Sequence, residues 1–258
     1  MCGISASFDL RRRKRDNDGE ATERRRARLS SMLDQSVGSM RHRGPDAKGI
    51  WISEDTSTGL GHVRLSTRDL SAAGHQPLHS GNESDDIHVV VNGELYYDTN
   101  LRADLEKEYS FQSTSDSEMV IALYRRYGAA FVDHLRGEFS LVIYDAKKQT
   151  LVVARDRFGV KPLHYGIFDG RLLIATQCKG VVELLDNRES LRWDGQCLAQ
   201  GGGHYGERTL FEGIRKFPPG NMLVVRQDQI EKAEQLEFMP YFHTKYPHNR
   251  GGLSLIHI

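Results

Sequence analysis

The chain has 258 residues, of which 38% are hydrophobic and 27% are charged, as is typical of a globular protein with one large domain or two small ones. Its 35 basic and 35 acidic residues balance, so the overall charge gives no indication of binding to nucleic acid or to a membrane surface. No apolar stretch approaches the roughly 18 residues of a membrane-spanning helix, and the N-terminus lacks the apolar segment of a signal peptide.

The N-terminal residues predict a buried strand that begins with a reactive side chain. Ile4, Ala6 and Phe8 alternate along residues 2–10, as expected for a strand. Cys2 directly follows the initiator methionine, and removal of that methionine would make Cys2 the N-terminal residue. Its α-amine, with an ordinary pKa of about 7.7–8.0, could then accept the proton of its own thiol. A structural cysteine that merely opens the strand is the alternative.

Two basic clusters follow, at residues 11–15 and 24–28. They could form a nuclear address or a patch that binds polyanions, but we favour a solvated loop that leads into a helix. Apolar residues at helical spacing predict this helix: Leu29, Met32, Leu33, Val37 and Met40. The three cysteines, an odd number in a chain of this length, indicate reduced thiols and a cytoplasmic protein.

The middle of the chain predicts short strands separated by loops and helices. A strand over residues 87–91 ends in Asn92-Gly93, a pair typical of a tight turn with positive φ. His75 and His79 are four residues apart, but a proline lies between them, so they do not share a helical face as zinc ligands would. Other strands are expected at 50–52 and 59–66, and helices around 101–105, 117–124 and 131–135.

From residue 137 onwards the sequence alternates between strands and turns. Two hairpins are expected: 139–144 with 151–154, and 163–168 with 172–176. A short helix at 181–185, a glycine-rich loop and a final strand at 222–225 follow. Antiparallel hairpins with helices clustered between them predict an α+β fold, in which sheets stack and helices lie outside.

Several polar residues suit the hydrolysis of a primary amide by an N-terminal thiol. That reaction requires donors at the oxyanion, a cation for a substrate carboxylate and an anion for a substrate ammonium. Asn92 and Gly93 offer a side-chain amide and an unhindered N–H, Arg64 offers the cation and Asp116 the anion. Each has a structural alternative, since Asn-Gly commonly forms turns and an aspartate commonly caps a helix. The residues alone do not establish that these groups meet.

Eight motifs then occur in order along the chain: Cys2-Gly3-Ile4, residues 41–46 (RHRGPD), 61–66 (GHVRLS), 92–96 (NGELY), 115–118 (SDSE), 136–139 (RGEF), 154–163 (ARDRFGVKPL) and 218–220 (PPG). Together they resemble the glutaminase domain of class II glutamine amidotransferases, in the asparagine synthetase branch. The resemblance extends over residues 2–227. It implies the N-terminal nucleophile hydrolase fold, a four-layer αββα sandwich of two antiparallel sheets.

The resemblance also implies roles for individual residues. The thiol of Cys2 would attack the side-chain amide of glutamine, with its own α-amine as proton shuttle. The Asn92 side chain and the Gly93 N–H would form the oxyanion hole.

Substrate contacts follow in the same way. Arg64 would bind the substrate carboxylate, and Asp116, with Glu94 nearby, the α-ammonium. Thr67 and Arg68 stand where the family usually has two aliphatic residues. Backbone carbonyls there help to hold the ammonium, so Thr67 is an expected contact. No metal or cofactor is expected in this chain.

The resemblance assigns residues 1–240 to the glutaminase domain and residues 241–252 to the start of a linker. In the family a synthetase domain follows, which uses ATP and Mg²⁺ to make asparagine from aspartate and the released ammonia. Its Ser-Gly-Gly-x-Asp-Ser phosphate loop has no counterpart in this sequence. Residues 253–258 read like a translated sequencing adapter, so we expect a native protein of about twice this length or more.

Glutamine is the expected substrate, and a homodimer is possible. Two alternative functions stay open from the sequence. The ammonia could serve an acceptor other than aspartate, because a glutaminase domain does not identify its acceptor. The chain could also be a non-catalytic paralogue that only binds, although such a protein has no physical need for all five of Cys2, Arg64, Asn92, Gly93 and Asp116.

Overall fold

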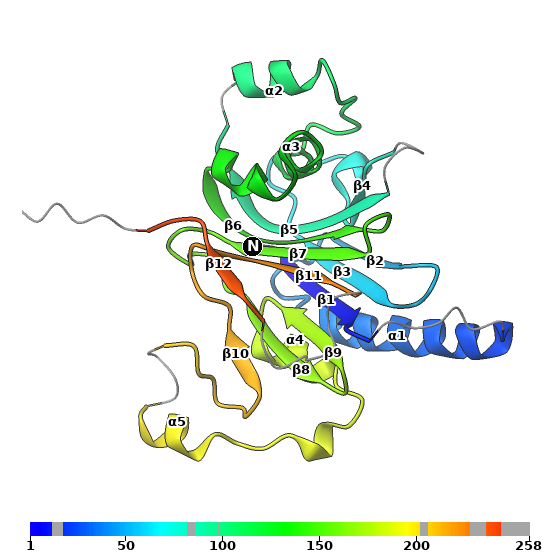
Figure 1. Cartoon of the computed structure of the whole chain (residues 1–258), viewed down its shortest axis with the longest axis vertical. Coiled ribbons are helices and arrows are strands. Elements are labelled where there is room, and N and C mark those ends of the chain that lie inside the picture. The colour runs from blue at the N-terminus through cyan, green and yellow to red at the C-terminus, as the bar shows by residue number, and fades with distance from the viewer. Residues whose placement is uncertain (12–17, 82–85, 98, 202–205, 228–235, 244–258) are drawn as a thin grey trace, which may run out of the picture.

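The computed structural model describes residues 1–11, 18–81, 86–97, 99–201, 206–227 and 236–243 (Figure 1). The strands in this part of the chain are β1 (Gly3–Asp9), β2 (Ala47–Ile52), β3 (Thr58–Arg64), β4 (Leu78–His79), β5 (Ile87–Leu95), β6 (Gly137–Asp145), β7 (Thr150–Arg155), β8 (His164–Phe168), β9 (Arg171–Ala175), β10 (Ile214–Lys216), β11 (Asn221–Arg226) and β12 (Phe238–Pro240). The α-helices are α1 (Gly19–Ser39), α2 (Thr99–Leu105), α3 (Met119–Tyr127), α4 (Cys178–Glu183) and α5 (Gly195–Ala199).

The strands form two antiparallel six-stranded sheets. The first sheet has the order β10-β8-β9-β1-β3-β2, and the second has the order β12-β11-β7-β6-β5-β4. The N-terminal strand β1 is therefore central in its sheet, between β9 and β3. Its register places Gly3 opposite Val63 and Ser5 opposite Ala175. The first residues of the chain thus lie beside the end of β3, where Arg64 is found.

The two sheets pack face to face, with helices on both outer faces (Figure 1). One apolar cluster fills the space between the sheets and includes Ile4, Phe8 and Tyr144. A second cluster joins the outer face of the second sheet to α3, and a third joins the outer face of the first sheet to α1 and α4. This arrangement confirms the predicted α+β fold with αββα layers.

The alternation of side chains along β1 explains how one strand serves two layers. Ala6 and its apolar neighbours on the same face point into the inter-sheet cluster. On the opposite face, the Ser5 hydroxyl lies 2.8 Å from that of Ser36 on α1. Glycines on the adjacent strand let the helix approach: a Cβ on Gly61 would lie 2.7 Å from a methyl carbon of Val37.

Helix α1 corrects one prediction and leaves another untested. It begins at Gly19, and the Asp18 carboxylate accepts the Ala21 N–H as its N-cap (3.2 Å). The basic cluster at residues 24–28 therefore lies on a helix and not in a loop. Residues 12–15 of the first basic cluster lie outside the described residues.

The predicted tight turn at Asn92-Gly93 is wrong. Strand β5 continues through both residues to Leu95, paired with β6 along its whole length, and Gly93 does not have a positive φ. The glycine is needed for close approach of the neighbouring strand, since a Cβ there would lie 2.1 Å from the Glu138 carbonyl oxygen.

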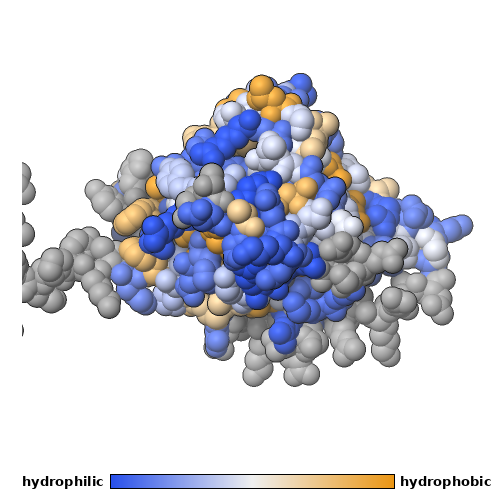
Figure 2. Space-filling view, turned by 90° about the horizontal axis from the view of Figure 1, so that it is seen from above, coloured by the Kyte–Doolittle hydropathy of each residue, from blue (hydrophilic) through white to orange (hydrophobic). Residues whose placement is uncertain are grey.

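The remaining elements follow the predictions in part. Both predicted hairpins form, as β6–β7 and β8–β9. The short elements α5, β10 and β12 were not predicted, and the strand at 222–225 is not the last, because β12 pairs with it. No helix in the described part of the chain is long and apolar enough to cross a membrane. The surface seen from above the view of Figure 1 is mostly hydrophilic, with small groups of hydrophobic residues (Figure 2).

Candidate active site

Cys2 lies immediately before β1, where the backbone of Leu65 contacts its thiol and the side chain of Arg43 holds its carbonyl. The Leu65 N–H donates to the Cys2 Sγ (3.4 Å), and the thiol lies 3.8 Å from the Leu65 carbonyl oxygen. Arg43 Nε donates to the Cys2 carbonyl oxygen (2.9 Å). Arg43 belongs to the 41–46 motif, so this segment fixes the backbone of the predicted nucleophile.

The pKa of the Cys2 thiol shows which charges lie near it. Burial raises this pKa above its ordinary value. The Leu65 hydrogen bond, the N-terminal ammonium and the positive charge of Arg64 lower it, and the negative charge of Asp116 raises it. The structure thus brings together Cys2, Arg64 and Asp116, which are far apart in the sequence.

Arg64 ends β3 and is buried. Its Nη1 donates to the Ser71 carbonyl oxygen (2.8 Å), and its Nη2 donates to the Asp69 carbonyl oxygen. A Cβ on Gly74 would lie 2.4 Å from Nη2, so this glycine leaves room for the guanidinium. Because a guanidinium has five N–H groups, others can bind a carboxylate.

The carboxylate of Asp69 shapes the loop that holds Arg64. It accepts the Ser71 N–H (2.8 Å), the Ser71 hydroxyl (2.6 Å) and the Thr114 N–H (2.9 Å). The hydrogen bond from the Ser71 hydroxyl is the main cause that lowers the pKa of Asp69 well below its usual range. The loop after β3 is therefore tied to the segment that leads to Asp116. Asp69 was not predicted as a site residue, although Asp-x-Ser is a recognisable Asx-turn pattern.

Asn92 and Glu94 share the face of β5 that points toward the first sheet. Side chains alternate along a strand, and Val90, two residues before Asn92, belongs to the inter-sheet cluster. His62 on β3 joins the sheets nearby, since its Nε2 lies 3.1 Å from the Val91 carbonyl oxygen. Burial lowers the pKa of His62 to about 3, so the ring is neutral and donates this hydrogen bond.

The buried amide of Asn92 makes one hydrogen-bond contact within the described part of the chain. Its Nδ2 lies 3.4 Å from the Ser140 hydroxyl, while Oδ1 has no hydrogen-bond partner among the described residues. Turned through 180°, the amide would accept from Ser140 through Oδ1, and its N–H groups would be available to a substrate oxygen. Ser140 was not predicted as a site residue, because it contacts the site only through another side chain.

Asp116 is buried beside β5. Its Oδ2 accepts the Leu95 N–H (2.7 Å), and burial raises the pKa of the carboxyl above its ordinary value. The predicted cap at this position is formed by Ser115 instead, whose hydroxyl accepts from the Ser117 N–H. The carboxylate of Asp116 is thus oriented by the same strand that carries Asn92.

The other two predicted substrate contacts, Glu94 and Thr67, are less buried than Arg64 and Asp116. Glu94 is half-buried and lies opposite Glu138 on β6, which pairs with Lys161 (3.0 Å). Thr67 is exposed on the loop three residues after Arg64. Among the described residues there is no group of three or more His, Cys, Asp or Glu side chains that could hold a metal ion.

The long motif at residues 154–163 has a structural role next to the site. The Asp156 carboxylate accepts the N–H groups of Phe158 (3.1 Å), Val160 (2.9 Å) and Lys161 (3.0 Å). Arg155 donates to the carbonyl oxygen of Gly159 in the same turn (2.7 Å). The turn therefore aims Lys161 at Glu138, beside the proposed substrate contact Glu94.

Comparison with known proteins agrees with this geometry. A family model described as "Glutamine amidotransferase domain" matches residues 1–237. The chain is 40% identical to amidase chry2 of Gibberella zeae over 249 residues, which are 96% of this chain and 35% of that protein. It is 37% identical to asparagine synthetase B (glutamine-hydrolyzing) of Escherichia coli over 184 residues, which are 70% of this chain and 30% of that protein.

Among solved structures, glutamine phosphoribosylpyrophosphate amidotransferase from B. subtilis shares the fold. It has a TM-score of 0.63 at 18% sequence identity, and the match covers 94% of this chain and 50% of that chain. The chain spans about a third of the length of the curated relatives it matches. The family match nonetheless covers nearly the whole chain. The chain therefore belongs to the class II glutamine amidotransferases.

Proposed function

We propose that this chain, once Met1 has been removed, hydrolyses the side-chain amide of glutamine to glutamate and ammonia. The observation that carries the proposal is that the Cys2 thiol is held by the backbone of Leu65, the residue after Arg64, within range of the charges of Arg64 and Asp116. A free amino acid has a carboxylate and an ammonium group, and the arginine and the aspartate have the complementary charges. Glu94 and the backbone at Thr67 would add contacts to the ammonium.

The chemistry follows from the chain's own groups. The α-amine of Cys2 takes the thiol proton, and the thiolate forms a C–S bond to the amide carbon. The resulting oxyanion accepts hydrogen bonds from the Asn92 side chain and the Gly93 N–H. The ammonium of Cys2 returns the proton to the leaving nitrogen, the C–N bond breaks, and ammonia departs. Water then attacks the thioester carbon, the C–S bond breaks, and glutamate and the free thiol result.

The position of Met1 supports the proposal that the α-amine of Cys2 becomes free only after Met1 is removed. In this chain Met1 is exposed, and its sulfur lies 3.9 Å from both Arg43 Nη2 and Lys161 Nζ. Loss of Met1 would leave the α-amine of Cys2 next to the thiol that it must deprotonate. An exposed first residue is also accessible to an aminopeptidase.

The ammonia is proposed to serve amide formation in the remaining part of a longer protein. Similarity to asparagine synthetase B favours aspartate as the acceptor, with ATP and Mg²⁺ bound outside this chain. A second acceptor is favoured by a separate observation: amidase chry2 and amidase chyE match 96% of this chain at 40% and 41% identity. A carboxylate other than aspartate would then be amidated.

The first experiment measures glutamate released from glutamine by protein with an authentic, trimmed N-terminus. Cys2→Ala and a protein with a tag before Cys2 are the controls. We expect the trimmed protein to be active and both controls to be inactive, because the first control lacks the thiol and the second lacks the free amine. Full activity in the tagged protein would contradict the role of the amine. Trimmed, folded protein that binds glutamine without hydrolysing it would favour the non-catalytic alternative.

The acceptor is tested with the longer native protein. Glutamine, ATP and Mg²⁺ are supplied with aspartate or with other carboxylic acids, and the amide product is identified by mass spectrometry. Asparagine formation would support the first acceptor. Glutamine hydrolysis without asparagine formation, but with another amide product, would support the second.

A further inference from the structure

A cavity lined by arginines lies at the end of β1 that is remote from Cys2. Its volume is about 290 Å³, and the charged side chains on its wall are Arg11, Arg25, Arg28, Arg171, Asp169 and Asp186. We call it the arginine cavity. Because β1 runs over seven residues, its ends are roughly 20 Å apart, so this cavity is separate from the proposed active site.

Helix α1 supplies one wall of the arginine cavity. Arg25 and Arg28 are three residues apart and so share a face of the helix. Leu29 and Met32 contribute apolar surface to the same wall. Arg26 donates to the carbonyl oxygens of Ser53 (3.2 Å) and its neighbours, which fixes the β2–β3 turn against the helix.

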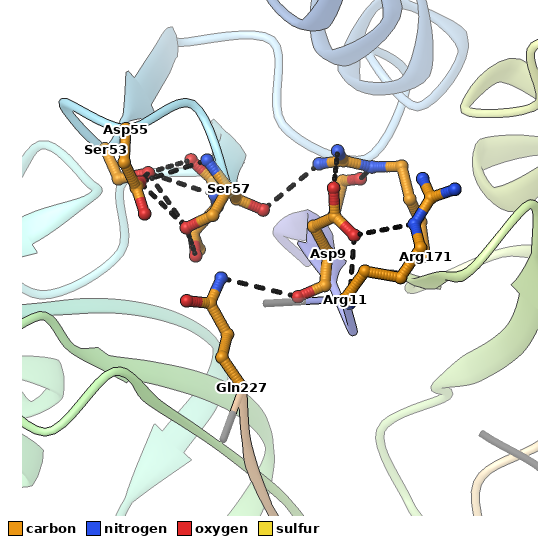
Figure 3. Close-up of polar contacts among 9 residues, drawn as sticks. Asp9, Arg11, Ser53, Asp55, Ser57, Arg171 and Gln227 are labelled. Carbon is orange, nitrogen blue, oxygen red and sulfur yellow. Dashed lines mark hydrogen bonds and ion pairs between the residues drawn. The ribbon is translucent and has the colours of Figure 1, made fainter. Parts of the chain in front are cut away.

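The opposite wall is a preformed network around a buried carboxylate (Figure 3). Arg171 is largely buried, donates to the Ser7 hydroxyl (2.8 Å) and pairs with Asp9 (3.6 Å). Arg11 pairs with the other oxygen of Asp9 (3.3 Å). A Cβ on Gly170 would lie 2.9 Å from Arg11 Nε, so the absence of a side chain at this glycine leaves room for the guanidinium of Arg11.

Among the described residues that line the cavity, cationic side chains outnumber anionic ones. Four guanidinium groups line it, against the carboxylates of Asp169 and Asp186. Asp186 pairs with Arg28 (2.9 Å), and Asp9 behind the wall adds one more negative charge. A wall on which guanidinium groups outnumber carboxylates attracts an anion.

Thr56 provides a second, independent observation. It lines the arginine cavity and is 2% exposed, and its hydroxyl has no hydrogen-bond partner among the described residues. A buried hydroxyl without a partner costs free energy, so a ligand that accepts its hydrogen bond would be stabilised. Its φ of 58° is also unusual for a β-branched residue.

We propose that the arginine cavity binds a small phosphate-bearing anion. Guanidinium groups match the geometry and charge of phosphate oxygens, and a threonine hydroxyl adds a donor. The volume suits a pyrophosphate group or a small phosphate ester, whose organic part would rest on Leu29 and Met32. A cavity of about 290 Å³ is too small to hold more than a short part of a polyanion such as RNA, so a small anion is the better match.

The test is isothermal titration calorimetry of the whole chain with inorganic pyrophosphate at low ionic strength. Saturable binding is expected, and Arg25→Gln should weaken it about ten- to a hundredfold, as for the loss of a charged hydrogen bond. The matched control is Arg24→Gln. Arg24 lies on the same helix but pairs with Glu20 outside the cavity, so this variant should bind as the parent does.

Thr56→Val is the second variant, because it keeps the side-chain shape and the charge while removing the hydroxyl. It should weaken binding about fivefold and leave the far-ultraviolet circular dichroism spectrum unchanged. Absence of saturable pyrophosphate binding, or an equal loss in Arg24→Gln, would overturn the proposal. So would binding of single-stranded poly(U) by a chain that does not bind pyrophosphate.

Discussion

At the scale of single residues, Asn92 is the clearest test of the proposed oxyanion hole. It is 1% exposed, and among the described residues its side chain makes one hydrogen-bond contact, a long one to Ser140. Asn92→Ala should therefore lower kcat for glutamine hydrolysis about 10²–10³-fold and leave the fold intact. Ser140→Ala should lower kcat only about two- to tenfold, because it removes the group that orients the amide. A kcat for Asn92→Ala within tenfold of the parent would exclude the assigned role.

The electrostatics of Cys2 give a second residue-level prediction. Burial raises the pKa of the thiol, and the negative charge of Asp116 raises it further. Because only the thiolate reacts with iodoacetamide, the alkylation rate of the Met1-containing chain should rise with pH and reach half its maximum above the ordinary thiol pKa of about 8.5. Asp116→Asn removes a charge that opposes the thiolate, so it should move this midpoint to lower pH.

Both proteins also carry Cys178→Ala and Cys197→Ala, so that Cys2 is the cysteine whose alkylation is measured. An Asp116→Asn midpoint equal to that of the parent would show that the carboxylate does not act on the thiol. A shift to higher pH would contradict the assigned sign. The asparagine can still accept the Leu95 N–H through its side-chain oxygen, so the variant keeps the local fold.

At the scale of secondary structure elements, the pairing of β5 with β6 explains the need for Gly93. A Cβ there would meet backbone atoms of Glu138 and Phe139, which cannot move like the end of a flexible side chain. Gly93→Ala should destabilise the protein by about 2–3 kcal/mol in urea unfolding. Gly38→Ala is the matched control. Apart from its own helical turn, no atom of the described residues lies within 4 Å of a Cβ at this position. In helix α1 the change should stabilise by about 0.5–1 kcal/mol.

The same strand shows what the sequence could and could not predict. The hairpins β6–β7 and β8–β9 were predictable, because alternating apolar residues and turn residues are local signals. Asn92-Gly93 was misread as a turn. A turn glycine and a glycine needed for close approach of a neighbouring strand look alike in the local sequence, and the strand that decides between them lies more than 40 residues later. The elements β10, β12 and α5 are three to five residues long and depend on distant partners.

The site was predictable to a similar extent. Arg64, Asn92 and Asp116 were identified from motifs, and the charges of Arg64 and Asp116 act on the pKa of the Cys2 thiol. Their contacts to a substrate stay predictions. Asp69 was missed because its carboxylate organises the loop whose carbonyl oxygens hold Arg64. The Asp-x-Ser pattern indicates a turn, but it does not show that the carbonyl oxygens of this turn hold Arg64.

At the scale of the whole molecule, the two sheets share one apolar cluster, so they should unfold together. Trp51 on β2 reports on the contact between sheets, since its ring stacks on His88 of β5 with centroids 3.6 Å apart. In a Trp193→Phe background its fluorescence should change at the same urea concentration as the far-ultraviolet circular dichroism. Two separate midpoints would show that the sheets unfold independently.

Leu60 then tests whether the shared cluster controls both signals. It is fully buried in the inter-sheet cluster, on β3. Leu60→Ala should lower the free energy of unfolding by about 2–5 kcal/mol, and both midpoints should fall together. Leu70→Ala is the control, because Leu70 is 77% exposed and its truncation should change stability by less than about 0.5 kcal/mol. If Leu60→Ala lowered only the circular dichroism midpoint, the two sheets would unfold independently. Cys2 on the first sheet and Asn92 on the second would then not be held in one rigid site.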